Sequence, residues 1–173
     1  CSEILKKISR KQIKDDQFIS SVKTEDLIEE IINSFRETSS KEITLISDED
    51  ENKIDIQRTP EIIYGLRNFI GNAVKFSKSK VVIQLKSNKK DISIIVNDDG
   101  PGFPEDIKNV LGEPYIKSKS KEVRLNSGLG LGTFLGKTLL EKQGAKLFFS
   151  KNKKFGGAAV SIYWDIKNLR STS

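Results

Sequence analysis

The stretch KVVIQLKSNKKDISIIVNDDGPG, residues 80–102, carries the clearest fold signal in the chain. Two runs within it, 80–87 and 91–98, are rich in Val and Ile and mix apolar with polar positions, which is typical of strands. A short polar turn joins them, so they predict two consecutive strands. The second run ends in DDGPG, a loop whose Gly and Pro residues interrupt regular structure.

Amphipathic helices are expected on both sides of these strands. Apolar residues at helical spacing predict one helix after Thr24, and Pro60 is expected to open another that runs to about Phe76. A third helix follows the glycines at 128–132. Residues 1–14 indicate the end of a further amphipathic helix.

The remaining strand signals come in two pairs. Residues 42–47 and 53–58 predict one hairpin, and residues 145–151 with 157–166 predict another. All these elements together predict an α/β two-layer sandwich. Its sheet would be mixed but mostly antiparallel, with about five strands covered on one face by about three helices.

The composition excludes several kinds of chemistry. With one Cys and no His among 173 residues, the chain has no internal disulfide, no Cys/His metal site and no mechanism that uses its own imidazole. Its net charge of +6 comes from 30 basic residues interspersed with 24 acidic ones, which indicates a mixed, solvated surface and no nucleic-acid partner. Because the chain also has no Met, we expect it to be a fragment of a longer protein.

Asp98 lies where the second strand of the opening stretch ends, and Gly100 and Gly102 leave space beside it. A carboxylate at such a position can accept a hydrogen bond from an exocyclic amine such as that of adenine. An ordinary Asp-Gly turn is the alternative.

Gly128, Gly130 and Gly132 form a G-x-G-x-G loop that runs into a helix. Small residues let backbone N–H groups approach an anion, and a helix N-terminus adds positive potential. The segment is neither a dinucleotide fingerprint, which would need Gly in place of Thr133, nor a P-loop, which would need Gly in place of Leu131. A phosphate cradle and a plain flexible loop both fit the motif taken alone.

Asn68, Asn72 and Lys75 are spaced by four and three residues, so they share one helical face. Two amides on a face that otherwise points toward the core are costly unless they find partners. Mg²⁺ with nucleotide phosphates would supply those partners. The alternative is a pair of ordinary surface asparagines.

Along the chain the asparagine pair comes first, Asp98 second and the glycine loop last, with a Lys-rich loop between Asp98 and the glycines. Together the three motifs make a complete nucleotide site. They resemble the N, G1 and G2 boxes of the ATP-binding domain of sensor histidine kinases, within the wider ATPase group that includes gyrase, Hsp90 and MutL. GEPYIKSK (112–119) resembles the F box and lid of that family, and GGAAVSIYW resembles its last strand pair. The resemblance spans residues 24–165 and implies the Bergerat fold.

Three further segments narrow the resemblance. GEPY and KTLLEKQGA are similar to the RegB/PrrB-type redox-responsive kinases. CSEIL resembles the end of the dimerisation helices of those kinases, where a redox-active cysteine is found, and makes Cys1 a candidate redox residue. An incidental position of Cys1 is the alternative.

The resemblance implies a role for each matched residue. Asp98 would bind the adenine amine in a pocket shaped by Gly100 and Gly102. Asn72 would be the Mg²⁺ ligand, with Asn68 supporting the metal or the phosphates. The implied catalytic residues are Asn72, Lys75 and Lys119, the last being a lid lysine that reaches the terminal phosphate. The remaining implied nucleotide contacts are Tyr115, Gly128, Leu129, Gly130, Leu131, Gly132 and Thr133.

The chain departs from the family pattern at a few positions. Thr133 stands where relatives usually have an apolar residue. Gly112 stands where many relatives have Phe, and Ala158 stands where Thr is common. The gyrase branch activates water with a Glu four residues before its first motif Asn, and Tyr64 stands there in this chain. A phenol cannot serve as that base near neutral pH. Phosphoryl transfer to a histidine is therefore expected rather than hydrolysis; a non-catalytic nucleotide-sensing module and a gyrase- or Hsp90-type ATPase are the alternatives.

The same resemblance implies a domain plan and partners. Residues 1–20 would be the end of a dimerisation and phosphoacceptor helix with its linker, and residues 21–173 would be the ATP-binding catalytic domain. The partners would be the missing dimerisation domain and a response regulator. We expect the fragment to be monomeric and unable to phosphorylate itself on His, whereas the full-length protein would be a homodimer. The fragment would be a cytoplasmic domain, and its parent would be a bacterial protein anchored in the inner membrane.

Overall fold

The structure is a computed structural model that describes residues 21–48, 55–88, 90–103 and 130–165. Several sequence predictions fall outside these residues. They concern the helix at 1–14, the F box and lid, and the residues Cys1, Gly112, Tyr115, Lys119, Gly128 and Leu129.

A five-stranded sheet runs in the order β2-β4-β5-β7-β6. β2 (Glu42–Ser47) is parallel to β4 (Lys80–Ser87), and every other neighbouring pair is antiparallel. The other strands are β5 (Asp91–Asp98), β6 (Ala145–Lys151) and β7 (Ala158–Asp165). The predicted mixed, mostly antiparallel sheet is therefore confirmed.

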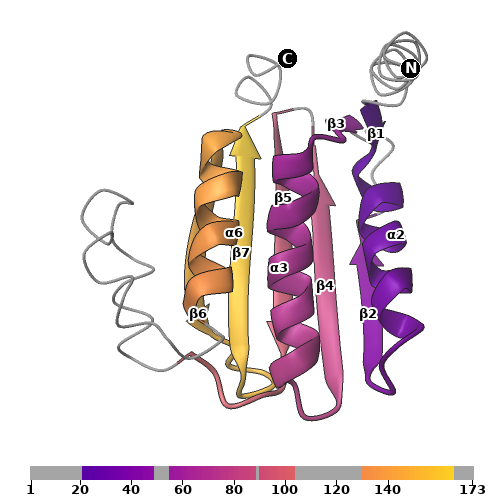
Figure 1. The fold of residues 1–173 in the computed structure, drawn as a ribbon, viewed down its shortest axis with the longest axis vertical. Coiled ribbons are helices and arrows are strands. Elements are labelled where there is room, and N and C mark those ends of the chain that lie inside the picture. The colour runs from indigo at the N-terminus through magenta and orange to yellow at the C-terminus, as the bar shows by residue number, and fades with distance from the viewer. Residues whose placement is uncertain (1–20, 49–54, 89, 104–129, 166–173) are drawn as a thin grey trace, which may run out of the picture.

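Three helices lie side by side on one face of this sheet, with α3 in the centre (Figure 1). They are α2 (Thr24–Arg36), α3 (Pro60–Phe76) and α6 (Gly130–Lys142). The core lies between the two layers and includes Leu66, Ile83 and Trp164, all fully buried. The predicted two-layer sandwich is confirmed, and no helix in the described ranges is long and apolar enough to cross a membrane.

One predicted strand pairing is wrong. The first hairpin does not form, because β2 pairs with β4, and β3 (Asp55–Gln57) pairs with β1 (Ser21–Lys23) in a separate two-stranded sheet. The parallel register sets Ile43 beside Val81 and therefore places it on the face that the helices cover. Burial of this apolar face favours the parallel pairing over a local hairpin.

Helix α3 begins as predicted. Thr59 accepts a hydrogen bond from the Ile62 amide at 3.2 Å, and Pro60 occupies the first turn. A side-chain cap and a proline with a preset φ both favour a helix start at this point. The position of α3 matters because the candidate site is built along its length.

Helices α3 and α6 pack closely through glycines. A Cβ atom added at Gly65 would overlap the Leu140 side chain, and one added at Gly136 would lie 3.0 Å from the Cβ of Asn68. These glycines therefore allow α6 to approach α3 closely, from the middle of α6 to its last turn.

Candidate functional site

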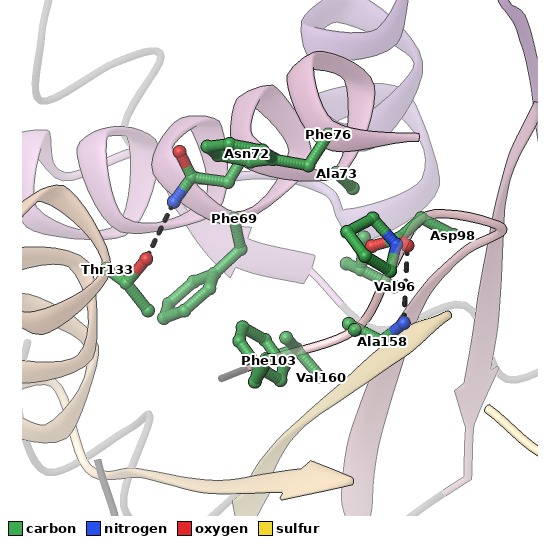
Figure 2. A pocket seen from close by; sticks show the side chains of 12 residues that line it. Phe69, Asn72, Ala73, Phe76, Val96, Asp98, Phe103, Thr133, Ala158 and Val160 are labelled. Atoms are coloured by element: carbon green, nitrogen blue, oxygen red, sulfur yellow. Dashed lines mark hydrogen bonds between the residues drawn. The ribbon is translucent and has the colours of Figure 1, made fainter. Parts of the chain in front are cut away.

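A pocket of about 170 Å³ opens between α3, α6, the ends of β5 and β7, and the loop after β5. Figure 2 shows Asn72 and Thr133 at one end, Asp98 and Ala158 at the other, and aromatic rings between them. The lining is mostly apolar, which suits a flat heterocycle. The full set is Phe69, Asn72, Ala73, Phe76, Val96, Asp98, Pro101, Gly102, Phe103, Thr133, Ala158 and Val160.

Two of the aromatic rings that line the pocket, Phe69 and Phe103, pack against a further ring that is not part of the lining. Phe149 of β6 packs edge-on against Phe103, with ring centroids 5.6 Å apart, and tilted against Phe69 at 5.9 Å. Such pairs add to the energy of burial and fix ring orientation. The apolar wall of the pocket is therefore a preformed surface.

Asp98 is the buried carboxylate at the other end of the pocket. It is 6% exposed, and its Oδ1 accepts hydrogen bonds from the amides of Gly100 at 2.8 Å and Ala158 at 3.2 Å. Burial raises the pKa of Asp98, and these two hydrogen bonds oppose that rise. The carboxylate is thus fixed in orientation and can accept a further hydrogen bond from a ligand.

Backbone approaches around Asp98 require glycine at two positions. A Cβ at Gly100 would collide with the carbonyl oxygen of Phe76, and a Cβ at Gly157 would collide with the carbonyl oxygen of Asp98. Gly102, at φ +83°, lines the pocket. The motif of Asp98 pointed to Gly100 and Gly102, but nothing in the sequence distinguished Gly157 from a turn glycine.

The neighbouring Asp99 has a structural role, which sequence reasoning missed. Its carboxylate accepts hydrogen bonds from the amides of Lys78, Ser79 and Lys80 and from the Ser79 hydroxyl. These hydrogen bonds hold the pKa of Asp99 well below its usual range. Asp99 therefore anchors the connection between α3 and β4 and does not line the pocket.

Asn72 and Asn68 both use their NH₂ groups within the protein. The Asn72 Nδ2 donates to the Thr133 hydroxyl oxygen at 2.8 Å, and the Asn68 Nδ2 donates to the Tyr64 carbonyl at 2.9 Å (Figure 2 shows the first bond). In the described part of the chain, neither side-chain carbonyl oxygen accepts a hydrogen bond. Such oxygens are ligands that Mg²⁺ accepts, so the donor set fits this ion.

The described residues contain no cluster of three or more His, Cys, Asp or Glu that could hold a metal by itself. A metal ion here would therefore need oxygens from a ligand in addition to the two amides. This is the usual way in which proteins bind Mg²⁺ together with substrate phosphates.

A second pocket, of about 380 Å³, adjoins the first at Asn72. It is an open groove over the solvent side of α3, and Tyr64 and Lys75 are among its exposed lining residues. The Lys75 ammonium lies 5.3 Å from the centre of the Phe76 ring. The full lining is Phe35, Tyr64, Arg67, Asn68, Gly71, Asn72 and Lys75.

The predicted glycine loop lies partly inside α6. The helix begins at Gly130, so Gly130, Leu131 and Gly132 belong to its first turn instead of the loop before it. A Cβ at Gly132 would lie 3.3 Å from the Oδ1 of Asn68. The first turn of α6 is therefore adjacent to the two asparagines.

Fold and pocket together define a class of nucleotide-binding domain, and comparison with known proteins identifies the family. Residues 57–168 match the family described as histidine kinase-, DNA gyrase B-, and HSP90-like ATPase. The chain belongs to this family, which makes it an ATP-binding domain.

Among curated relatives, the chain is 36% identical over 135 residues to sensor histidine kinase RegB of Cereibacter sphaeroides. This match covers 69% of the chain but 29% of RegB, so the chain spans less than a third of that relative. It is also 29% identical over 77 residues to CpxA of Escherichia coli, a match covering 44% of the chain and 17% of CpxA.

Solved structures show the same fold. The catalytic domain of histidine kinase ThkA superposes with a TM-score of 0.67 at 20% identity, covering 84% of this chain and 96% of that one. The ATP-binding domain of PrrB from Mycobacterium tuberculosis gives 0.60 at 21% identity, covering 84% and 95%. The Bergerat fold that the family resemblance implied is confirmed.

Proposed function

We propose that this chain binds Mg²⁺-ATP and donates the γ-phosphate to a histidine outside the 173 residues, as the catalytic half of a sensor histidine kinase. One observation carries the proposal. A single pocket has a fixed, buried carboxylate at one end and the amide of Asn72 at the other, where it opens into a groove that carries cations. Family membership and the similarity to RegB support it.

The pocket would hold the adenine ring. Its apolar wall excludes water from the faces of the base, and the Asp98 carboxylate accepts the hydrogen bond of the exocyclic amine. Because Gly100 and Ala158 fix the Oδ1 atom, the carboxylate needs no reorientation when the base arrives. Gly100 and Gly102 would shape this end of the site.

The far end of the pocket would hold the metal and the phosphates. Mg²⁺, when bound by the carbonyl oxygens of Asn72 and Asn68, neutralises phosphate charge. Lys75, Lys119 and the first turn of α6 would add positive potential around the same oxygens. We assign the remaining contacts, from Tyr115, Gly128, Leu129, Gly130, Leu131, Gly132 and Thr133, on the family resemblance.

The acceptor is expected to be a protein side chain and not water. Tyr64, at the position of the water-activating Glu in gyrase-type enzymes, is 63% exposed and is a phenol. The chain contains no His, so the phosphate would go to a histidine on a separate dimerisation domain. Residues 1–20 would belong to that domain and its linker, and residues 21–173 to the catalytic domain.

The wider system follows from the same proposal. The phosphorylated histidine would pass its phosphate to a response regulator, and the full-length protein would be a homodimer, whereas the 173-residue chain would be a monomer. We further propose a RegB-like parent anchored in the bacterial inner membrane, with this chain on its cytoplasmic side and Cys1 as a redox-active residue.

Binding of a fluorescent ATP analogue in the presence of Mg²⁺ tests the site. Asp98→Asn keeps the shape of the side chain but presents an NH₂ group to the adenine amine, so affinity should fall by about tenfold or more. Asn72→Ala should weaken binding only when Mg²⁺ is present. Asp91→Asn, at the other end of β5, is the matched control and should bind as the wild type does. Unchanged binding by Asp98→Asn would contradict the site assignment.

A second assay tests the reaction. The chain is mixed with radiolabelled ATP and a separately produced dimerisation domain of a RegB-type kinase, and acid-labile phosphohistidine is measured. Phosphoryl transfer to that domain by the wild type, and its loss in the Asn72→Ala variant, would support the proposed kinase activity. ATP binding without transfer, also when the two domains are fused, would favour a nucleotide sensor, and rapid steady hydrolysis by the chain alone would favour a gyrase-type ATPase.

A further inference from the structure

The two pockets fix a direction along helix α3. Asp98 lies against the C-terminal end of α3, where a Cβ on Gly100 would meet the Phe76 carbonyl. From there the first pocket leads to Asn72, and the second pocket continues past Asn68 to Tyr64. A nucleotide whose base contacts Asp98 therefore extends its phosphates toward the N-terminal half of α3.

The second pocket, a groove that runs along α3 from Tyr64 to Lys75, is positively charged. Arg67 and Lys75 are its two charged lining residues, and no Asp or Glu is among the described residues that line it. Lys75 makes no ion pair in the described part of the chain. A groove with two cations and no carboxylate favours an anionic ligand.

Arg67 is held in place by helix α2. Its Nη1 donates to the Ser34 hydroxyl oxygen at 3.1 Å, and its guanidinium carbon lies 5.3 Å from the centre of the Phe35 ring. The Ser34 hydroxyl itself donates to the Ile31 carbonyl at 2.6 Å, which orients its lone pairs toward Arg67. A guanidinium fixed in this way loses little side-chain entropy when it binds a ligand.

The charge of Arg67 is not cancelled by a neighbouring carboxylate. Glu30 is close enough for Arg67 to lower its pKa, but both Glu30 oxygens are bonded to Arg58, at 2.5 and 2.6 Å. In the described part of the chain, Arg67 uses one of its N–H groups in a hydrogen bond. The others are available to an oxyanion in the groove.

We propose that Arg67 is a phosphate-binding residue that contacts the terminal phosphoryl group of the nucleotide. This inference rests on the proposed function and assigns a residue to which neither the sequence motifs nor the family resemblance gave a role. A guanidinium binds phosphate oxygens through two parallel N–H groups, which gives both charge and geometry. Arg67 would therefore make the site favour ATP over ADP.

The test compares the affinities of the 173-residue chain for ATP, ADP and AMP with Mg²⁺ present, measured by calorimetry. Arg67→Ala should weaken ATP binding by about tenfold, because a charge-assisted hydrogen bond is lost, and leave ADP and AMP within about twofold. Lys86→Ala, which removes the same charge from the face of the sheet away from the helices, should change none of the three. Equal weakening of all three nucleotides, or unchanged ATP binding, would overturn the proposal.

Two further variants distinguish a failure of the Arg67 assignment from a failure of the proposed ATP-binding function. Arg67→Lys keeps a charge but not the fork, so it should give an intermediate ATP-to-ADP preference, and it serves if the alanine variant is unfolded by circular dichroism. If Arg67→Lys and Arg67→Gln both keep the wild-type preference for ATP over ADP, the role of Arg67 is overturned, whereas the proposed function is not. If Asp98→Asn binds all three nucleotides as tightly as the wild type, both the proposed function and this inference fail.

Discussion

At the scale of single residues, Asp98 and Asp99 are adjacent carboxylates in opposite environments. Asp98 faces an apolar pocket, and burial raises its pKa, whereas hydrogen bonds from the turn before β4 lower the pKa of Asp99. The first carboxylate is left with capacity for a ligand, and the second is saturated by the protein. One position along the chain therefore separates a carboxylate that lines the pocket from a structural one.

The raised pKa of Asp98 predicts a conflict between stability and binding. A carboxyl group whose folded pKa is raised stabilises the fold at low pH, and this contribution is lost as the pH rises through that pKa. At neutral pH the ionised group therefore costs stability. Asp98→Asn should raise the melting temperature of the nucleotide-free protein at pH 7 while weakening ATP binding.

The measurement is thermal unfolding of both proteins at several pH values without nucleotide. The advantage of the variant should shrink as the pH falls toward 4, because the wild-type carboxyl then gains its proton. A variant that melts below the wild type at neutral pH would contradict this account of Asp98.

In the proposed site, Thr133 would orient the Asn72 carbonyl oxygen toward the metal. Its hydroxyl is almost fully buried and accepts the hydrogen bond of the Asn72 NH₂ group, which turns the carbonyl oxygen away from α6. Thr133→Val keeps the shape but loses the acceptor, so the increase in ATP affinity that Mg²⁺ produces should fall by about tenfold. Thr133→Ser should retain it.

Affinity measured with Mg²⁺ and with EDTA for each variant separates positioning from packing. A structural defect would lower both affinities equally, and Thr133→Ser would not rescue it. If Thr133→Val keeps the full effect of Mg²⁺, Asn72 is positioned by something other than Thr133.

At the scale of elements, the site depends on how closely α6 approaches α3. Gly65 faces Leu140, which is fully buried, and Gly136 faces Asn68. Gly65→Ala should destabilise the protein by about 1 to 3 kcal/mol through overpacking, less the small gain in helix propensity. Leu140→Ala alone should cost about 2 to 5 kcal/mol, through the cavity it leaves.

Denaturant unfolding of the double variant decides whether the two side chains compete for one space. The Cβ of the new alanine would fill part of the cavity left by Leu140, so the double variant should be more stable than the sum of the single effects predicts. Additive effects would show that α6 shifts to make room, and would contradict a rigid α3–α6 contact.

The sequence predicted elements better than their pairing. Alternation and caps are local, so α3, β4, β5 and the last hairpin could be anticipated. The pairing of β2 with β4 could not, because it joins strands that are far apart in the chain, with β3 and α3 between them. β1 was missed because its three residues are too few to show a pattern.

The site was predictable to a similar degree. Asp98, Asn68 and Asn72 could be found because their motifs state both residue type and spacing. Gly157 and the hydrogen bond between Asn72 and Thr133 could not, because each depends on a contact between segments about 60 residues apart. Arg67 has no motif at all, and only its contacts with α2 and its place in the groove single it out.

At the scale of the whole molecule, the helical layer and the sheet contribute different groups to the candidate site. The sheet supplies Asp98 and part of the apolar wall, and α3, in the centre of Figure 1, supplies the rest of that wall together with the asparagines and the cations. In the proposed arrangement the base would be buried between the layers and the phosphates would lie near solvent. The terminal phosphate would then be accessible to a histidine on another domain.

A crystal structure of the chain with Mg²⁺ and a non-hydrolysable ATP analogue tests this arrangement most directly. The account predicts the adenine amine within hydrogen-bonding distance of the Asp98 carboxylate, Mg²⁺ on the Asn72 carbonyl oxygen, and the phosphates in the groove over α3. A base bound away from Asp98, or phosphates that leave the pocket on the side away from Asn72, would contradict it.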